Sequence, residues 1–225
     1  MISEILLCLD LLALRYFNNL RLEQKEVNQY QLKLGYTKGI INKQILVDMR
    51  ITPHLFVVGL SGQGKSKMVE KAIKGKQVVL LNAFKDDFKT IQAKRILGNV
   101  NILKYLNGLL QSVREGKKWT RPLYLVFDEL LVLCVDKNIT KAITDLLAIG
   151  RHYNIFIVGI SQIGTKESVK FKDLFNSRVC FRQVEESSYR VVLGSSVEDT
   201  KLKKREFYLY SDDIYRGYTY SVTDN

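Results

Sequence analysis

The stretch that decides the fold is FVVGLSGQGKSKMVEKAIKG, which occupies residues 56–75. It starts with an apolar run typical of a strand, passes through three glycines and ends with a pattern typical of a helix. Residues 59–66, GLSGQGKS, match the spacing G-x-x-x-x-G-K-[ST] at every fixed position. That spacing forms a phosphate-binding loop when a strand precedes it and a helix follows it. We therefore predict such a loop at residues 59–66.

Each part of this loop has a physical task in binding a nucleotide. Glycines let successive backbone N–H groups point at phosphate oxygens, next to the helix N-terminus that favours negative charge. Lys65 would reach the β- and γ-phosphates, and the Ser66 hydroxyl would coordinate Mg²⁺. The predicted nucleotide-binding residues are Gly59, Leu60, Ser61, Gly62, Gln63, Gly64, Lys65, Ser66 and Lys67.

Two further apolar runs end in polar side chains that suit the chemistry of phosphate hydrolysis. Residues 123–130, LYLVFDEL, place Asp128 and Glu129 at the end of a predicted buried strand, where ligands bind in open α/β sheets. We expect Asp128 to bind Mg²⁺ and Glu129 to act as general base on the attacking water. Gln162 ends the next strand as a sensor of the γ-phosphate, unless it only caps that strand.

The remaining elements predict an α/β fold with a mostly parallel central sheet flanked by helices. Continuously apolar runs indicate strands buried on both faces, and the helical intervals between them, such as residues 137–152, are long enough for crossovers. The strands are expected at residues 54–58, 77–81, 123–127, 154–159 and 178–182. At the C-terminus, FYLY at 207–210 and YTYSV at 218–222 flank DDIYRG and predict a short β-hairpin.

The chain divides into residues 1–50, an N-terminal amphipathic helix with a lead-in segment, and residues 51–225. Leucine and isoleucine recur at helical spacing in the first 20 residues, but Asp10 interrupts a run already too short to span a bilayer. This helix either docks on the protein's own core or contacts a membrane surface or a partner protein. The three widely spaced cysteines indicate a reduced, cytoplasmic protein.

Charge and missing motifs narrow the choice of nucleotide and partner. The chain has 35 Lys and Arg against 23 Asp and Glu, a formal net charge of +12 that attracts polyanions. The N-K-x-D motif that reads guanine in small GTPases is missing, so ATP is the expected nucleotide. No arginine-rich lid of the kind that small-substrate kinases use can be located in the sequence.

The order of motifs resembles the motor domain of the FtsK–HerA superfamily of DNA-pumping ATPases, over residues 53–210. The segments that carry the resemblance are GLSGQGKS, LYLVFDELLVL, LLAIGRHYNIFIVGISQ, FNSRVCFRQVEESSYRVVLGSS and KREFYLY. It implies a RecA-like P-loop NTPase fold, a ring that is usually a hexamer, and ATP hydrolysis coupled to movement of double-stranded DNA. Ile163 departs from the pattern, since many relatives carry arginine after the sensor glutamine.

Ring ATPases of this kind complete each nucleotide pocket with a positive charge from the neighbouring subunit. The candidates for that charge are Arg178, Arg151 and Arg182, in this order of preference. Each of these arginines could instead form a surface ion pair of little consequence.

DNA contact is expected from basic loops that bind phosphates without reading bases. The candidate segments are residues 74–76, 84–89, 114–121 and 165–172, of which the last is preferred because it follows the sensor strand. The resulting hypothesis is an ATP-driven DNA translocase for genome packaging, conjugation or transfer of a plasmid or mobile element. The alternative is an ATP-binding switch that controls partner docking and is not a motor.

Overall fold

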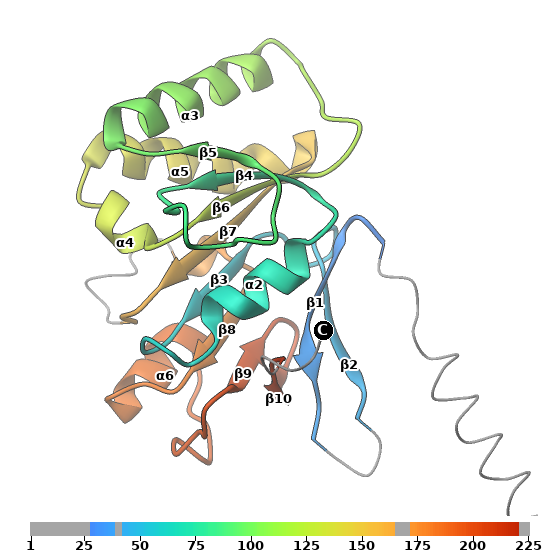
Figure 1. Ribbon diagram of the computed structural model, residues 1–225, viewed down its shortest axis with the longest axis vertical. Helices are drawn as coiled ribbons and strands as arrows, with labels where there is room; N and C mark the ends of the chain where they lie inside the picture. The colour runs from blue at the N-terminus through green and yellow to red at the C-terminus, as the bar shows by residue number, and fades with distance from the viewer. Residues whose placement is uncertain (1–27, 39–41, 165–171, 221–225) are drawn as a thin grey trace, which may run out of the picture.

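The computed structural model describes residues 28–38, 42–164 and 172–220, which form one ten-stranded sheet with helices on both faces (Figure 1). The strand order is β2-β1-β10-β9-β8-β3-β7-β6-β4-β5. The strands are β1 (Gln31–Tyr36), β2 (Gln44–Asp48), β3 (Leu55–Val58), β4 (Gln77–Leu81), β5 (Lys94–Ile96), β6 (Leu123–Phe127), β7 (Ile155–Ser161), β8 (Ser177–Phe181), β9 (Glu206–Tyr210) and β10 (Ile214–Tyr218). The helices are α2 (Lys65–Ile73), α3 (Asn99–Arg114), α4 (Leu130–Leu133), α5 (Lys137–Ile149), α6 (Glu186–Leu193) and the short 3₁₀ turns η1 (Gly150–Tyr153) and η2 (Lys172–Leu174).

The parallel part of the sheet confirms the predicted fold class. Strands β8, β3, β7, β6, β4 and β5 are parallel neighbours in that order. β4 and β6 have the predicted bounds, and β3, β7 and β8 differ from them by one or two residues at an end. Every residue of β3, β6, β7 and β8 is buried, because helices cover both faces of these strands.

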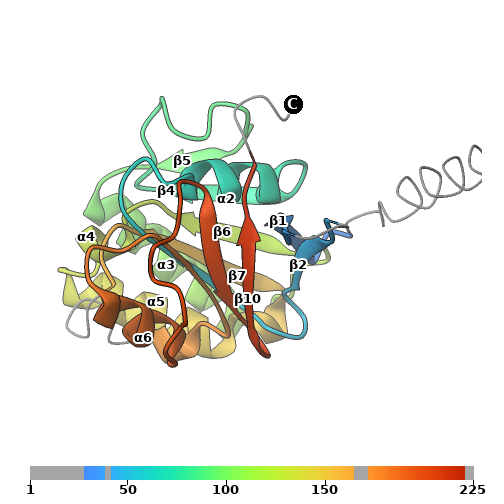
Figure 2. The same ribbon diagram turned by 90° about the horizontal axis from the view of Figure 1, so that it is seen from below.

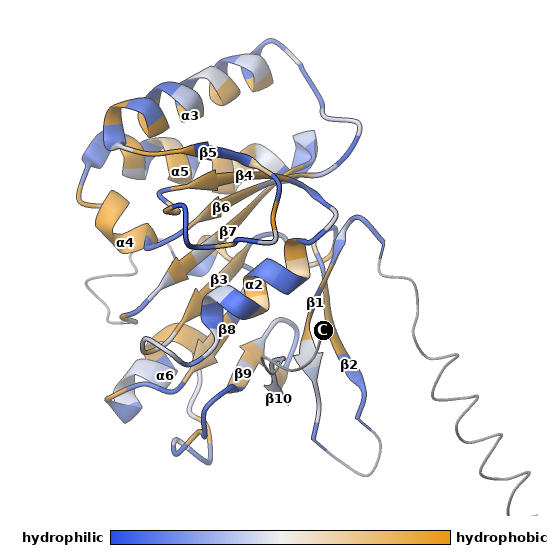
Figure 3. Cartoon of the chain, in the orientation of Figure 1, coloured by the Kyte–Doolittle hydropathy of each residue, from blue (hydrophilic) through white to orange (hydrophobic). Residues whose placement is uncertain are grey.

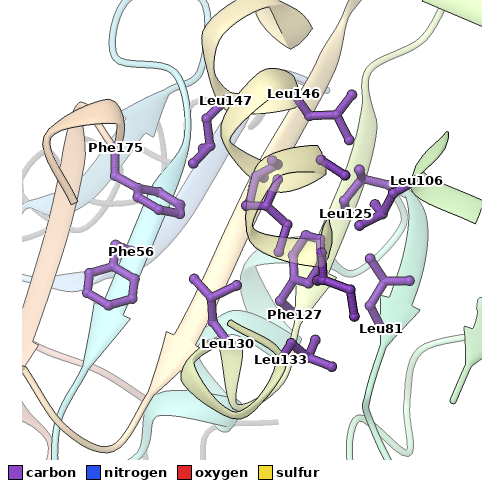
Figure 4. Packing of buried hydrophobic residues seen from close by; sticks show 14 of the residues in the cluster. Phe56, Leu81, Leu106, Leu125, Phe127, Leu130, Leu133, Leu146, Leu147 and Phe175 are labelled. Atoms are coloured by element: carbon purple, nitrogen blue, oxygen red, sulfur yellow. The ribbon is translucent and has the colours of Figure 1, made fainter. Parts of the chain in front are cut away.

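Two hydrophobic cores lie on opposite faces of the sheet. Figure 2 shows α2 on one face and α5 and α6 on the other. The face that α2 covers packs Val57 and Val158 against Met68, and the other face packs Phe56, Phe127 and helices α3 to α6. In Figure 3 the central strands are apolar along their length, whereas α2 carries its polar residues on its outer side. Figure 4 shows the second core, in which leucines from several elements fill the space around Phe127.

Strands β1, β2 and β5 were not predicted from the sequence, and β1 and β2 extend the sheet into the segment expected to lead into the domain. They pair with each other in antiparallel fashion, and Tyr36 of β1 pairs with Tyr218 of β10. Their buried residues Leu32, Leu34, Ile45 and Val47 join the core beneath α2. The predicted N-terminal helix lies outside the described residues, and in the described part no helix has the length and apolarity to cross a membrane.

The C-terminal hairpin is present, but the prediction of its second strand at residues 218–222 is wrong. β9 and β10 pair in antiparallel fashion from Ile214↔Tyr210 to Tyr218↔Glu206, so β10 begins four residues earlier. The turn needs only residues 211–213, because aspartate side chains satisfy its backbone. Asp212 Oδ1 accepts a hydrogen bond from the N–H of Asp213 at 3.1 Å, and Asp213 Oδ1 accepts one from Ile214 at 2.7 Å.

Packing of β1 beneath α2 predicts that this strand contributes to the stability of the whole domain. Leu34 is fully buried, so Leu34→Ala should lower the free energy of unfolding by about 2–4 kcal/mol, measured by urea denaturation. Lys43→Ala is the matched control: Lys43 is exposed, its contacts to Thr37 use the backbone, and its loss should cost less than about 0.5 kcal/mol. Equal unfolding curves for Leu34→Ala and the wild-type protein would contradict this packing.

Candidate nucleotide-binding site

The predicted loop lies at the edge where the carboxyl ends of the parallel strands meet. Val58 at the end of β3 pairs with Ser161 of β7, and β7 in turn is the parallel neighbour of β6. A cleft of about 380 Å³ opens at this edge. It is lined by Ser61, Gly62, Gly64, Lys65, Ser66, Lys67, Asp87, Asp128, Glu129, Ile160 and Gln162. Residues that are distant in the sequence therefore meet at the carboxyl edge, as open α/β sheets allow.

Glycines give the loop its shape. Gly62 and Gly64 have φ angles of 74° and 110°, a region that disfavours residues with a side chain. Gly64 caps the N-terminus of α2, so the free N–H groups of the first turn face the cleft. At Gly59 a Cβ atom would lie 2.5 Å from Cβ of Phe181, so only glycine lets β3 end this close to β8. This backbone geometry is what binding of phosphate oxygens requires.

Backbone hydrogen bonds connect the loop to both neighbouring strands. The N–H of Gly59 donates to the carbonyl of Ser161 at 3.2 Å, and the N–H of Leu60 donates to the carbonyl of Arg182 at 3.1 Å. Gln162 follows Ser161 directly, is exposed and lines the cleft. A movement of Gln162 would therefore reach the loop through Ser161, whose carbonyl accepts the hydrogen bond from Gly59. This connection fits the sensor role predicted for Gln162.

Lys65 is the buried cation of the site. Its side chain comes from the first turn of α2, and the residue is only 7% exposed. Nζ donates hydrogen bonds to the carbonyls of Gly59 at 2.6 Å and Leu60 at 3.0 Å, so it lies inside the curve of the loop. Burial lowers the pKa of this ammonium, while Glu129 and Asp128 oppose the effect. The charge thus faces the two carboxylates across the cleft.

Asp128 and Glu129 directly follow β6, and the backbone is strained at Glu129. The N–H of Asp128 donates to the carbonyl of Leu81 at 3.0 Å, and Asn82 Nδ2 donates to the carbonyl of Asp128 at 3.2 Å. Glu129 has a φ of 54°, in the left-handed region. Burial, Asp87 and Glu129 raise the pKa of Asp128 to about 6, with Lys65 acting in the opposite direction. The carboxylate of Asp128 is therefore short of positive charge.

The donors in the cleft fit Mg²⁺ bound together with a nucleotide. Ser66 and Asp128, the two residues predicted to bind the metal, both line the cleft. Among the described residues no group of three or more His, Cys, Asp or Glu could hold a metal ion unaided. Mg²⁺ commonly takes only one or two protein ligands and completes its shell with phosphate oxygens and water, so this sparse set suits it.

Asp87 is the cleft residue that the sequence analysis missed. It belongs to the segment 84–89, which was considered there for DNA contact, but the structure places Asp87 beside Asp128 in the cleft. The signal that could have found it is its position: the segment follows β4, whose carboxyl end lies at the same sheet edge.

Arg178, the arginine preferred for action on a neighbouring subunit, is engaged within its own chain. Its Nη1 donates to the carbonyl of Val192 at 3.1 Å and lies 3.6 Å from a carboxylate oxygen of Asp173. Its guanidinium also stacks 4.5 Å from the ring centroid of Tyr210, and the residue is 8% exposed. Arg178 would have to break these contacts to reach another subunit.

Arg151 and Arg182 are exposed and lie at opposite ends of the parallel strands. Arg182 is at the carboxyl end and Arg151 is at the amino end. Arg182 directly follows β8 and accepts the hydrogen bond from Leu60, so it stands beside its own phosphate loop. Arg151 lies in η1, just before β7, and therefore at the opposite end of that strand from Gln162. Seven residues of β7 separate the two ends by about 23 Å.

The basic segments proposed for DNA contact differ in how far the structure describes them. Nearly all of the preferred segment, residues 165–171, lies outside the described residues. Lys76 of the first segment donates hydrogen bonds to the carbonyls of Asn28 and Gln29, and burial lowers its pKa to about 8, so it has a structural role. Lys117 of the third segment lies over the ring of Trp119. DNA contact by residues 74–76 or 114–121 stays a prediction.

Several solved structures share this fold, and three of them are named for conjugation, type VII secretion and genome packaging. The conjugation coupling protein TcpA of pCW3, in its monomer form with ATPγS, matches with a TM-score of 0.72 and 17% identity over 88% of this chain and 68% of TcpA. The cytoplasmic domain of the type VII secretion ATPase EccC from Thermomonospora curvata matches with a TM-score of 0.69 and 15% identity over 89% and 30%. The genome packaging NTPase B204 of Sulfolobus turreted icosahedral virus 2 matches with a TM-score of 0.54 and 16% identity over 75% and 98%.

These matches confirm the RecA-like P-loop fold and, at the level of the fold, the resemblance to FtsK–HerA ATPases. Neither models of protein families nor curated protein sequences give a match. The chain spans less than half of the EccC and EssC chains that it matches, so those proteins carry further regions.

The arrangement of the cleft predicts different effects for two of its residues. Lys65→Ala removes the buried cation and should abolish ATP binding. Glu129→Gln should keep ATP bound and stop hydrolysis, because Asp128 and the loop are unchanged and only the base is lost. Binding of a fluorescent ATP analogue and release of phosphate separate the two results. Loss of nucleotide binding in Glu129→Gln would mean that the roles of Asp128 and Glu129 are reversed.

Proposed function

We propose that this chain is an ATP-hydrolysing motor that moves double-stranded DNA, in a ring of identical subunits in the cytoplasm. The observation that carries the proposal is the cleft, which brings Lys65, Ser66, Asp128, Glu129 and Gln162 together at the end of a glycine loop. A phosphate-binding loop alone would suit many nucleotide-binding proteins. A carboxylate base beside the metal ligand favours hydrolysis over simple binding.

Each side chain has a distinct part in hydrolysis. Lys65 exchanges the carbonyls of Gly59 and Leu60 for oxygens of the β- and γ-phosphates and offsets their charge. Glu129 takes the proton of the attacking water. Gln162 orients that water or contacts the γ-phosphate. Ser66 and Asp128 would hold Mg²⁺ together with the phosphates, and the ion would supply the remaining positive charge.

Two features favour DNA as the cargo. The net charge of +12 suits a polyanion, which would be bound through its phosphates. Two of the structural matches are named for conjugation and for genome packaging, processes in which DNA is transported. Others are named for type VII secretion, and one of them is in complex with a signal sequence peptide, so a polypeptide cargo is the competing possibility. A comparison of ATP turnover with DNA and with peptide separates a DNA cargo from a polypeptide cargo.

Among the three candidate arginines, Arg151 is the one we propose for the neighbouring pocket. A residue that acts on another subunit has to lie away from its own cleft, as Arg151 does at the far end of β7. Arg182 stands next to its own loop, where it can act within one subunit. Arg178 holds α6 and β9 against β8 and stabilises the fold.

ATP turnover should respond to DNA if the protein is a motor. Long linear duplex should raise turnover several-fold above the rate without DNA. The DNA concentration that gives half of this stimulation should rise at least tenfold between about 50 and 200 mM salt, as phosphate contacts are lost. Phosphate release is the measurement, with duplex of equal mass cut into short fragments as the control. Turnover that ignores DNA would contradict a DNA motor, and stimulation by peptide instead would favour a polypeptide cargo. Indifference to both would favour the nucleotide-controlled switch.

Mixed rings test whether Arg151 acts across a subunit boundary. Arg151→Ala and Lys65→Ala should each be inactive alone, but a mixture should regain part of the activity. The reason is that an intact loop of one subunit can then pair with an intact arginine of the other. A mixture of Lys65→Ala and Glu129→Gln is the control, because both variants damage the pocket of their own chain and should give no rescue. Equal rates for the two mixtures would rule out Arg151 as the residue in trans.

A further inference from the structure

The loop between β4 and β5, residues 82–93, brings a third carboxylate to the nucleotide cleft. Figure 1 shows this loop running between α2 and β5. Asp87 is half-buried and lines the cleft together with Lys65, Ser66 and Asp128. Its neighbour Asp86 is exposed and pairs with Lys89 at 3.2 Å. Two adjacent aspartates therefore have opposite environments, one facing the site and one facing solvent.

Arg95 of β5 holds the loop in the conformation that directs Asp87 to the site. Its Nη1 donates to the carbonyl of Phe84 at 2.7 Å, and its Nη2 donates to the carbonyls of Asp87 at 2.7 Å and Phe88 at 3.1 Å. Such a fork of donors fixes a turn of backbone that has little regular secondary structure of its own. Phe88 is buried in the core beneath α2 and closes the turn from the other side.

A second anchor ties the same loop to the helix that follows the phosphate loop. Glu70 of α2, 7% exposed, accepts hydrogen bonds at Oε1 from the N–H of Thr90 at 2.8 Å and from its hydroxyl at 2.7 Å. Its other oxygen lies 3.4 Å from Nζ of Lys67, one of the cleft residues. The loop is therefore positioned by α2 and β5 together, as a residue with a precise role at the cleft would require.

Asp87 adds a negative charge to a cleft that already contains two carboxylates. The carboxylates of Asp87, Asp128 and Glu129 line the cleft together with two lysines. Lys65 is buried, whereas Lys67 is half-buried and pairs with Glu70. Asp87 is, after burial itself, the largest influence that raises the pKa of Asp128. Three carboxylates repel a nucleotide that carries no metal, and a bound divalent cation weakens this repulsion because it lowers the negative charge of the nucleotide.

We propose that Asp87 is a positioning residue of the nucleotide site that makes it selective for the metal-bound nucleotide. The proposal rests on the proposed function, because it assumes that the cleft binds ATP. Asp87 acts on the metal end of the cleft through its charge, while Ser66 and Asp128 are the residues that would hold Mg²⁺. Its charge attracts the Mg²⁺ of the metal-bound nucleotide and repels the phosphates of the nucleotide without metal.

The test compares binding of mant-labelled AMPPNP with excess Mg²⁺ and with EDTA, in the absence of DNA. In the wild-type protein the ratio of the dissociation constant in EDTA to that in Mg²⁺ measures the selectivity. Asp87→Asn should lower this ratio by roughly five- to tenfold, as expected for one unit charge at a partly screened distance. Binding in EDTA should tighten, a result that mere loosening of the loop would not give. Asp86→Asn removes the neighbouring charge and should leave the ratio unchanged within about twofold.

Further variants keep the outcome decisive. Asp87→Glu retains the charge and should recover most of the ratio, whereas Asp87→Ser should lower it as Asp87→Asn does. Thermal unfolding without nucleotide verifies that each variant is folded. A wild-type ratio in both neutral variants would overturn the proposal for Asp87. Failure of the wild-type protein to bind the analogue in either buffer would instead overturn the proposed function, so the two failures are distinguishable.

Discussion

The close contact between the phosphate loop and its neighbouring strands is the constraint on which the rest of the site depends. Gly59 ends β3 against Phe181, and the next hydrogen bonds run from the loop to Ser161 and Arg182. Because β3 lies between β7 and β8, the two bonds tie the loop to a strand on each side. The loop is therefore a rigid extension of the core, and the N-terminus of α2 is held at a fixed angle to the strands that carry the carboxylates.

The second organising feature is an excess of negative charge in the cleft. Lys65 is buried and satisfied by loop carbonyls, while Asp128, Glu129 and Asp87 have no other buried cation among the residues that line the cleft. Burying carboxylates without full compensation costs stability, and the pKa of Asp128 reflects that cost. A protein retains such an arrangement where a ligand completes the charge balance. We propose that this ligand is a nucleotide with its metal, whose binding would stabilise the folded state.

Four antiparallel strands extend the parallel part of the sheet on one side. The antiparallel strands β9 and β10 follow β8, and β1 and β2 continue the sheet beyond them. Buried residues of β1, β2 and β9, among them Leu34, Val47 and Phe207, belong to the core beneath α2. Arg178 joins α6 and Tyr210 to the parallel strands. Its engagement there leaves Arg151 and Arg182 as the arginines that are exposed at the two ends of the parallel strands.

The sequence by itself determined the parallel core and most of the site. Runs of apolar residues define buried strands whatever their neighbours, and the phosphate loop, Asp128, Glu129 and Gln162 are each set by residues adjacent in the chain. Tertiary structure alone decided the rest. β1 and β2 are short and half polar, so only pairing with each other and packing on α2 identifies them as strands. Asp87 and Asp86 look alike in sequence, and the exposure of Arg178 cannot be read from its neighbours. Their roles follow from anchors as distant as Arg95, Glu70 and Tyr210, because burial and charge depend on every element that packs around a residue.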